Sequence, residues 1–188
     1  MHLNSLALLA PILLAPTLAI SADRYRIDPD HTFPSIEFSH MGISTWRGKF
    51  TRSSGQIVLD RAAATGSVEV DVDTASIDFG LARMEQKARG EEYFNVAKFP
   101  TARYRGTLRF EAGEPRAVEG ELTLLGVTRP LMLLINSLRC VPSPLTNKEV
   151  CGADAEGELE WTAYGIHASR SGASRVRLRI QVEAQKQD

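Results

Sequence analysis

The sequence predicts an all-β protein, an antiparallel β-barrel of about eight strands with one short helix near residues 80–93. Apolar and polar residues alternate along most of the chain, in segments that short turns separate. Such alternation is typical of strands with one dry and one wet face. Only the stretch from Gly80 to Pro100 has apolar residues at helical spacing. A barrel leaves no exposed sheet edge, but a β-sandwich would bury the same faces, so alternation alone leaves both architectures open.

The first 22 residues predict a cleaved secretory signal peptide. They contain no Lys, Arg, Asp or Glu, and an apolar run from Leu6 to Leu18 precedes small residues between positions 19 and 22. We therefore expect a mature domain over residues 23–188 and a periplasmic location. A retained membrane anchor is the alternative, although the run is short for a spanning helix.

The segments before the helical stretch are short, and turn residues separate them. They are Tyr25–Ile27, Ile36–His40, Trp46–Thr51, Ile57–Leu59 and Val68–Val72. Gly42 between the second and third segments predicts a hairpin. The β-branched valines of the last segment are typical of a strand.

The stretch from Gly80 to Pro100 predicts a crossover helix that covers one end of the barrel. Leu81, Met84 and Ala88 fall on one helical face, and Gly90 is placed to end the helix. A compact apolar group follows, which we expect to pack against the end of the barrel: Tyr93, Phe94, Val96 and Phe99.

Alternation resumes after the helix. The expected strands are Ala102–Phe110, Val118–Leu124, Leu131–Leu138, Leu159–Ala163 and Val176–Val182. A turn over residues 126–130 predicts that the second and third of these strands form a hairpin.

Cys140 and Cys151 are the only cysteines, and we expect them to form a disulfide, as an even count in an exported protein indicates. The sequence between them, VPSPLTNKEV, reads as a long loop between two strands. Closing this loop contributes about 3 kcal/mol in the chain-entropy model. A catalytic or metal-binding thiol pair is disfavoured, because there is no CxxC spacing and no nearby His.

Three glycines lie in the middle of expected strands, on the dry face: Gly48, Gly106 and Gly120. A glycine at such a position either bends the strand or leaves space beside it. An eight-stranded barrel is at the size where side chains fill the interior or a small ligand does. The glycines favour a cavity, and a solid core with glycine corners is the alternative.

Charge and motifs disfavour several classes of function. The net charge is −1, and Lys and Arg do not gather in one run, so nothing predicts nucleic-acid binding. No nucleophile elbow, zinc-protease motif or phosphate-binding loop is present, so we predict no catalytic residues. His40 shares a strand face with Phe38, whereas Glu37 points the other way, so we expect no metal or cofactor there.

Four stretches occur in order along the mature chain: Tyr25–His31 with the following Ile36–Ser39, His40–Phe50, Tyr93–Pro100 and Gly120–Pro130. Together they resemble the YceI-like family of periplasmic, polyisoprenoid-binding, lipocalin-like proteins. The resemblance covers nearly all of residues 23–188.

The resemblance implies a lipocalin-like barrel whose apolar tunnel holds a long isoprenoid, quinone-like or fatty-chain ligand, for carriage or sequestration. It brings no catalytic residues. It also implies a possible partner, a cytochrome b561-type membrane protein, for which the chain would be a non-catalytic accessory protein in the alternative function. An enzyme acting on a lipid-like substrate is a third and less favoured function. The lipid and the oligomeric state stay open.

The chain departs from the family pattern in two places. Before Tyr93, the usual Arg-Asp start is replaced by the run from Arg83 to Lys87, so we expect a different cavity lid. Near the carboxyl end, residues 168–172 replace a polar and aromatic pattern.

The candidate ligand-binding residues lie on the predicted dry face or on the lid. They are Phe38, His40, Trp46, Phe50, Met84, Phe94, Phe99, Tyr104, Leu108 and Trp161. His40 and Tyr104 could also form hydrogen bonds with a polar head group. Ordinary core packing is the alternative for each of the ten.

Overall fold

A computed structural model describes residues 22–167 and 174–188. The predicted signal peptide, except for Ala22, and the stretch 168–172 lie outside these residues. The strands are β1 (Asp23–Ile27), β2 (Phe33–His40), β3 (Ser44–Phe50), β4 (Ser53–Asp60), β5 (Thr65–Asp73), β6 (Ile77–Asp78), β7 (Thr101–Glu111), β8 (Glu114–Leu124), β9 (Val127–Pro142), β10 (Glu149–Glu160) and β11 (Arg175–Lys186). The helices are α1 (Ala82–Arg89) and two short 3₁₀ helices, η1 (Thr74–Ser76) and η2 (Trp161–Tyr164).

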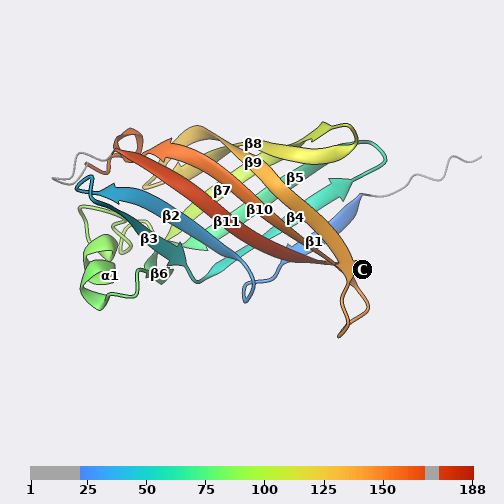
Figure 1. The fold of residues 1–188 in the computed structure, drawn as a ribbon, viewed down its shortest axis with the longest axis horizontal. Helices are drawn as coiled ribbons and strands as arrows, with labels where there is room; N and C mark the ends of the chain where they lie inside the picture. Colours follow the sequence, from blue (N-terminus) through green and yellow to red (C-terminus); the bar gives the residue numbers. More distant parts are fainter. Residues whose placement is uncertain (1–21, 168–173) are drawn as a thin grey trace, which may run out of the picture.

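Eight of the strands form a closed antiparallel ring, in the order β1-β4-β5-β7-β8-β9-β10-β11. The ring closes because β1 pairs with β11, with Tyr25 opposite Lys186 and Ile27 opposite Ala184. Figure 1 shows the resulting long barrel, with α1 at one end and the carboxyl terminus at the other. The predicted eight-stranded all-β barrel is therefore confirmed, and the sandwich is excluded.

Three further strands, β2, β3 and β6, belong to the same sheet but lie outside the ring. β1 and β2 both lie along β11: β1 pairs with its carboxyl-terminal part and β2 with residues 177–181. β4 and β3 follow the same division, since β4 pairs with β1 and β3 pairs with β2. β2, β3 and β6 thus extend the barrel wall beyond the ring, toward α1.

Helix α1 lies at the end of the barrel, where its buried Ala88 joins the largest hydrophobic cluster. The helix ends at Gly90, and the Phe94 N–H donates to the Ala88 carbonyl at 2.9 Å. This bond turns the chain back toward the barrel and buries Phe94 within it. The predicted crossover helix is confirmed, although it is shorter than the stretch from Gly80 to Gly90. Among the described residues, no helix has the length and apolar character needed to cross a bilayer.

Two predicted segments differ from the structure at their boundaries. The strand expected over Leu159–Ala163 is β10, which begins ten residues earlier, at Glu149. It ends at Glu160, because the chain bends there into η2 and the Trp161 N–H donates to the Ser174 carbonyl at 2.8 Å. The turn expected over residues 126–130 is only Leu125 and Gly126, which both have positive φ (53° and 75°). A two-residue turn of this kind matches the twist of a hairpin, so β9 begins at Val127.

The predicted disulfide between Cys140 and Cys151 is confirmed. The predicted long loop between them is wrong, because the two residues lie directly opposite each other on β9 and β10. The strands continue past the disulfide to Pro142 and from Glu149, so only residues 143–148 form the loop. The Ser143 N–H donates to the Lys148 carbonyl at 2.8 Å and closes this hairpin.

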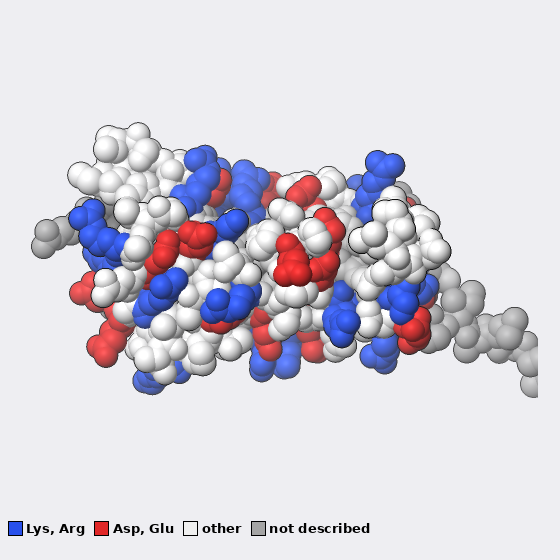
Figure 2. Space-filling view, turned by 90° about the horizontal axis from the view of Figure 1, so that it is seen from below, with Lys and Arg blue, Asp and Glu red and all other residues white. Residues whose placement is uncertain are grey.

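The outer face of the barrel carries opposite charges side by side. Arg103 pairs with Asp71 at 2.6 Å, and Arg52 pairs with Asp73 at 2.7 Å, across neighbouring segments. Figure 2 shows basic and acidic side chains interspersed along one side of the molecule. Such exposed pairs each contribute only about 0–1 kcal/mol, so the barrel owes its stability to its interior.

Gly48 and Gly120 do not create empty space. A Cβ at Gly48 would lie 2.5 Å from the Phe79 ring, and one at Gly120 would lie 2.7 Å from the Tyr104 hydroxyl. Each glycine therefore leaves room for an aromatic side chain from a neighbouring segment. The expectation that these glycines form the cavity is wrong at both positions.

Gly120→Ala tests this close packing, with Gly152→Ala as the matched control in another strand. A Cβ at Gly120 would approach the Arg105 carbonyl oxygen to 2.4 Å, whereas a Cβ at Gly152 would have its nearest neighbour at 3.6 Å. We expect Gly120→Ala to lower the free energy of unfolding by about 1–3 kcal/mol. Urea unfolding curves would show this loss, and equal stability of the two variants would contradict it.

Candidate functional site

The barrel encloses a cavity of about 210 Å³. Every strand except β6 contributes side chains to its wall. None of the lining side chains in the described chain belongs to Asp, Glu, Lys, Arg or His. The wall is therefore almost wholly apolar, as the alternation along the strands predicts.

The cavity is long and narrow. On β11, every second residue from Val176 to Ala184 lines it, which corresponds to about 26 Å of strand. Val70, Leu108 and Ile180 also line it, and each is only half-buried although its strand directs it inward. These side chains border open space, so the barrel has a hollow middle rather than a solid core.

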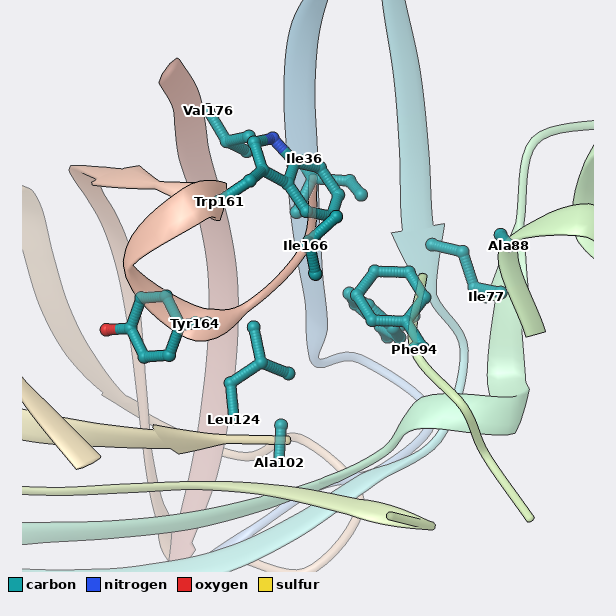
Figure 3. Close-up of a cluster of buried hydrophobic side chains, with 11 residues drawn as sticks. Ile36, Ile77, Ala88, Phe94, Ala102, Leu124, Trp161, Tyr164, Ile166 and Val176 are labelled. Atoms are coloured by element: carbon teal, nitrogen blue, oxygen red, sulfur yellow. The ribbon is translucent and has the colours of Figure 1, made fainter. Parts of the chain in front are cut away.

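Aromatic rings close the cavity at the α1 end. Phe94 lies 5.5 Å from Phe50 and 5.7 Å from Trp161, measured between ring centroids. Figure 3 shows Phe94 in the middle of the buried cluster, with Trp161 and Ile166 on one side and Ile77 on the other. Phe94 retains only 3% of its accessible surface, so its ring is a tightly packed barrier.

A polar network closes the opposite end. The hydroxyl of buried Tyr25 donates to Glu149, and Arg61 donates to that hydroxyl at 3.0 Å. Burial, followed by the bond to Glu149, raises the pKa of Tyr25 to about 12, so the phenol stays neutral at physiological pH. A second Arg61 nitrogen lies 3.1 Å from the Cys140 sulfur. The network thus joins the disulfide, the hairpin after β4 and the first strand.

A second space, which we call the side hollow, lies beside α1 and has a volume of about 350 Å³. It is lined by Phe38, His40, Trp46, Phe79, Leu81, Arg83, Met84, Lys87, Ala88, Tyr93, Phe94, Trp161, Ile166 and His167. Phe94 and Trp161 line both spaces, so these two rings separate the side hollow from the cavity.

The ten predicted ligand-binding residues fall into three groups. Phe50, Phe94, Tyr104, Leu108 and Trp161 line the cavity. Phe38, His40, Trp46 and Met84 line the side hollow, together with Phe94 and Trp161. Phe99 lines neither space and packs beside Gly126. A ligand-binding role for each of the ten stays a prediction.

The two residues proposed to contact a polar head group lie apart. His40 lines the side hollow and stacks on Trp46 at a centroid distance of 4.4 Å. The Tyr104 hydroxyl lies inside the barrel, within 3.1 Å of the Val118 carbonyl oxygen and 3.0 Å of that of Leu131. Burial raises the pKa of Tyr104, so its phenol is a neutral donor to the barrel backbone.

Sequence reasoning misses several lining residues. The valines of β5 and the inner residues of β11 lie on the predicted dry face and line the cavity. They are missing from the predicted site because most of its members are large aromatic residues. Phe79 follows a two-residue strand and has no periodic signal around it. Arg83 and Lys87 carry a signal only in the departure from the family pattern before Tyr93.

Among the described residues, one group of three possible metal ligands lies within reach of a common ion: Cys140, Glu149 and Cys151. The two sulfurs are bonded to each other, and Glu149 accepts from Tyr25. In this oxidised form the group does not offer thiolate ligands.

Comparisons with known proteins point to one family. A family model described as a YceI-like domain matches residues 25–185. Protein YceI from Salmonella arizonae is 32% identical over 183 residues, which cover 95% of each chain.

Solved structures show the same fold. BcnA from Burkholderia cenocepacia superposes with a TM-score of 0.68 at 20% identity, covering 84% of this chain and 98% of that one. A polyisoprenoid-binding domain from Saccharophagus degradans superposes with a TM-score of 0.63 at 16% identity, covering 87% of this chain and 98% of that one.

Tyr104→Phe separates a structural role of this hydroxyl from a role in ligand binding. Because the hydroxyl is committed to backbone carbonyls, we expect the variant to lose about 1 kcal/mol of stability in urea unfolding. Binding of an apolar fluorophore should be unchanged, since the ring is retained. A large loss of fluorophore affinity with unchanged stability would show that the hydroxyl acts in ligand binding rather than in stabilising the barrel.

Proposed function

The chain belongs to the YceI-like domain family, and from this premise we propose that it binds a long-chain lipid, with the apolar tail in the barrel cavity. The single observation that carries the proposal is the cavity itself. It is enclosed by a closed ring of strands, extends along much of β11, and is lined without a charged side chain in the described part of the chain.

The energetics favour an extended hydrocarbon chain as the ligand. Removing a methylene group from water is worth about 0.8 kcal/mol, so a five-carbon isoprene unit contributes about 3–4 kcal/mol. A lipid tail in a bilayer is already out of water, however, so the net gain on transfer is smaller. The protein would therefore load its ligand from a membrane or a partner rather than from free solution.

The proposed ligand is a lipid with an isoprenoid, quinone-like or fatty tail. The Saccharophagus degradans neighbour is described as a polyisoprenoid-binding domain, and a narrow apolar cavity suits an isoprenoid, quinone-like or fatty tail. We assign the protein to carriage or sequestration rather than to catalysis. The support is the lining, because no charged or histidine side chain of the described chain faces the cavity.

We also propose that the protein acts in the periplasm. The support is the signal-peptide pattern of residues 1–22 and the disulfide between Cys140 and Cys151, which is stable in an oxidising compartment. A cytochrome b561-type partner stays a prediction from family resemblance.

Extraction of the purified protein tests the proposal directly. The mature protein is purified without detergent and extracted with organic solvent, and the released lipids are identified by mass spectrometry. We expect one long-chain lipid per protein molecule. A protein that is empty, and that also takes up no isoprenoid, quinone or fatty amide from vesicles, would overturn lipid binding and favour an accessory role.

Phe94→Leu tests whether the aromatic barrier controls ligand exchange. The smaller side chain loses ring contacts with Phe50 and Trp161. If the opening barrier falls by about 1.4 kcal/mol, ligand exchange becomes about tenfold faster. Stopped-flow release of a fluorescent fatty acid measures this rate.

Phe110→Leu is the matched control, since Phe110 packs at the opposite end of the barrel and does not line the cavity. Equal release rates for the two variants would show that the ligand does not pass Phe94. Met84→Ala then tests the outer part of this route, because Met84 lines only the side hollow.

A further inference from the structure

The disulfide lies at the end of the barrel opposite α1, where its sulfurs are not sealed in the core. Cys140 and Cys151 are directly opposite each other on β9 and β10, and both are half-buried. Cys151 lines the end of the cavity. The chain has no other cysteine, so no internal thiol competes for either sulfur. A thiol of another molecule can therefore reach the bond without the barrel unfolding.

The hairpin that carries the disulfide is also held by other contacts. The two strands continue to pair beyond the bond, as far as Pro142 opposite Glu149. The Ser143 N–H donates to the Lys148 carbonyl at 2.8 Å. The Lys148 ammonium pairs with Asp188 at 2.8 Å, which joins the hairpin to the carboxyl end of the chain. Reduction would therefore leave the two thiols facing each other, in position to form the bond again.

The Arg61 guanidinium contacts both sulfurs. One of its nitrogens lies 3.1 Å from the Cys140 sulfur and 3.6 Å from the Cys151 sulfur. A sulfur without charge is a weak acceptor, so these contacts contribute little in the oxidised form. A thiolate at the same place carries a full negative charge, and a neighbouring Arg stabilises a thiolate. The contacts therefore become strong only when the bond is reduced.

Four other ionisable side chains, on three strands, belong to the network around Arg61: Asp23 and Tyr25 on β1, Glu149 on β10 and Lys186 on β11. Asp23 and Glu149 lie 3.6 Å and 3.5 Å from Arg61, and each has a second partner, Lys186 for Asp23 and the Tyr25 hydroxyl for Glu149. The Glu149 carboxylate lies within 4.8 Å of both sulfurs and opposes a thiolate. Arg61 is the group in contact with the sulfurs, so its charge has the larger effect.

We propose that Cys140 and Cys151 form a redox-active disulfide that exchanges with a protein dithiol, and that Arg61 stabilises the thiolate which the exchange releases. Cys140 is the better leaving group, because its sulfur lies nearer to Arg61. Cysteine chemistry of this kind is independent of the lipid binding proposed above.

The exchange takes place in two displacements. A thiolate of the dithiol attacks the Cys151 sulfur, the bond between the two sulfurs breaks, and Cys140 leaves as a thiolate beside Arg61. The second sulfur of the dithiol then displaces Cys151 from the mixed disulfide. Two electrons pass to the Cys140–Cys151 pair, the dithiol becomes a disulfide, and the two protons that it loses are taken up by Cys140 and Cys151.

The test equilibrates the oxidised mature protein with mixtures of reduced and oxidised thioredoxin at pH 8. Acid stops the exchange, and mass spectrometry after alkylation counts the free thiols. We expect the wild-type protein to reach an equilibrium with thioredoxin. R61Q should shift the equilibrium constant about tenfold toward the disulfide, because the variant loses the cation that stabilises the thiolate.

The pH dependence separates this role of Arg61 from a structural one. Stabilisation of a thiolate favours the reduced form only above the pKa of the thiol, so the difference between the wild-type protein and R61Q should shrink as the pH is lowered toward 5. R61K keeps the positive charge and should retain most of the wild-type behaviour. R139Q is the matched control, since Arg139 precedes Cys140, is exposed, and points to the other face of the sheet.

Each outcome decides one part of the proposal. A wild-type disulfide that stays intact in excess reduced thioredoxin would overturn the exchange. Equal equilibrium constants for the wild-type protein and R61Q at pH 8, or a difference that is the same at pH 5, would overturn the role of Arg61. None of these measurements involves a lipid, so lipid binding is tested separately.

Discussion

The pairing of β1 with β11 is the constraint on which the rest of the structure depends. It converts a sheet into a ring, so the alternation of apolar and polar residues separates an inside from an outside rather than two faces. The ring leaves only its two ends open. Phe94 and Trp161 occupy one end, and Tyr25 with Arg61 occupies the other. The cavity is therefore a direct product of ring closure and of the residues at the ends.

The interior stays hollow because its wall is built from small and medium side chains. The inner residues of β5 are valines, and alanines alternate along the inner face of β10 at Ala153 and Ala155. The largest aromatic side chains gather instead at the α1 end, around Phe94 and Trp161. An eight-stranded barrel is near the limit of what side chains can fill, so this distribution leaves the middle open. The glycines contribute by admitting Phe79 and Tyr104, not by leaving voids.

The sequence predicts features that depend on local patterns. Alternation identifies most of the strands, and the two cysteines identify the disulfide. It does not predict that β1 and β2 share β11 as a neighbour, because this pairing joins residues at least 140 positions apart and has no local signal. The side hollow is not predicted from the sequence for the same reason, because its wall combines residues from β2, β3, α1 and the segment around η2, which are far apart in the chain. The alternating pattern places Trp161 on a strand, but the turn at Trp161 depends on a hydrogen bond to Ser174, which has no local signal.

The extension formed by β2, β3 and β6 has a consequence for the dynamics of the molecule. In the described chain, its strand pairing with the ring is limited to residues 177–181 of β11, and it ends in the two-residue strand β6, whereas the ring closes on itself. Local unfolding follows the number of backbone hydrogen bonds, so the extension is a cooperative unit with a lower opening free energy than the ring. The disulfide fastens the far end of the ring. The protein therefore has a stability gradient along its long axis: the ring at the disulfide end is the more stable part, and the extension at the α1 end can open locally while the ring stays folded.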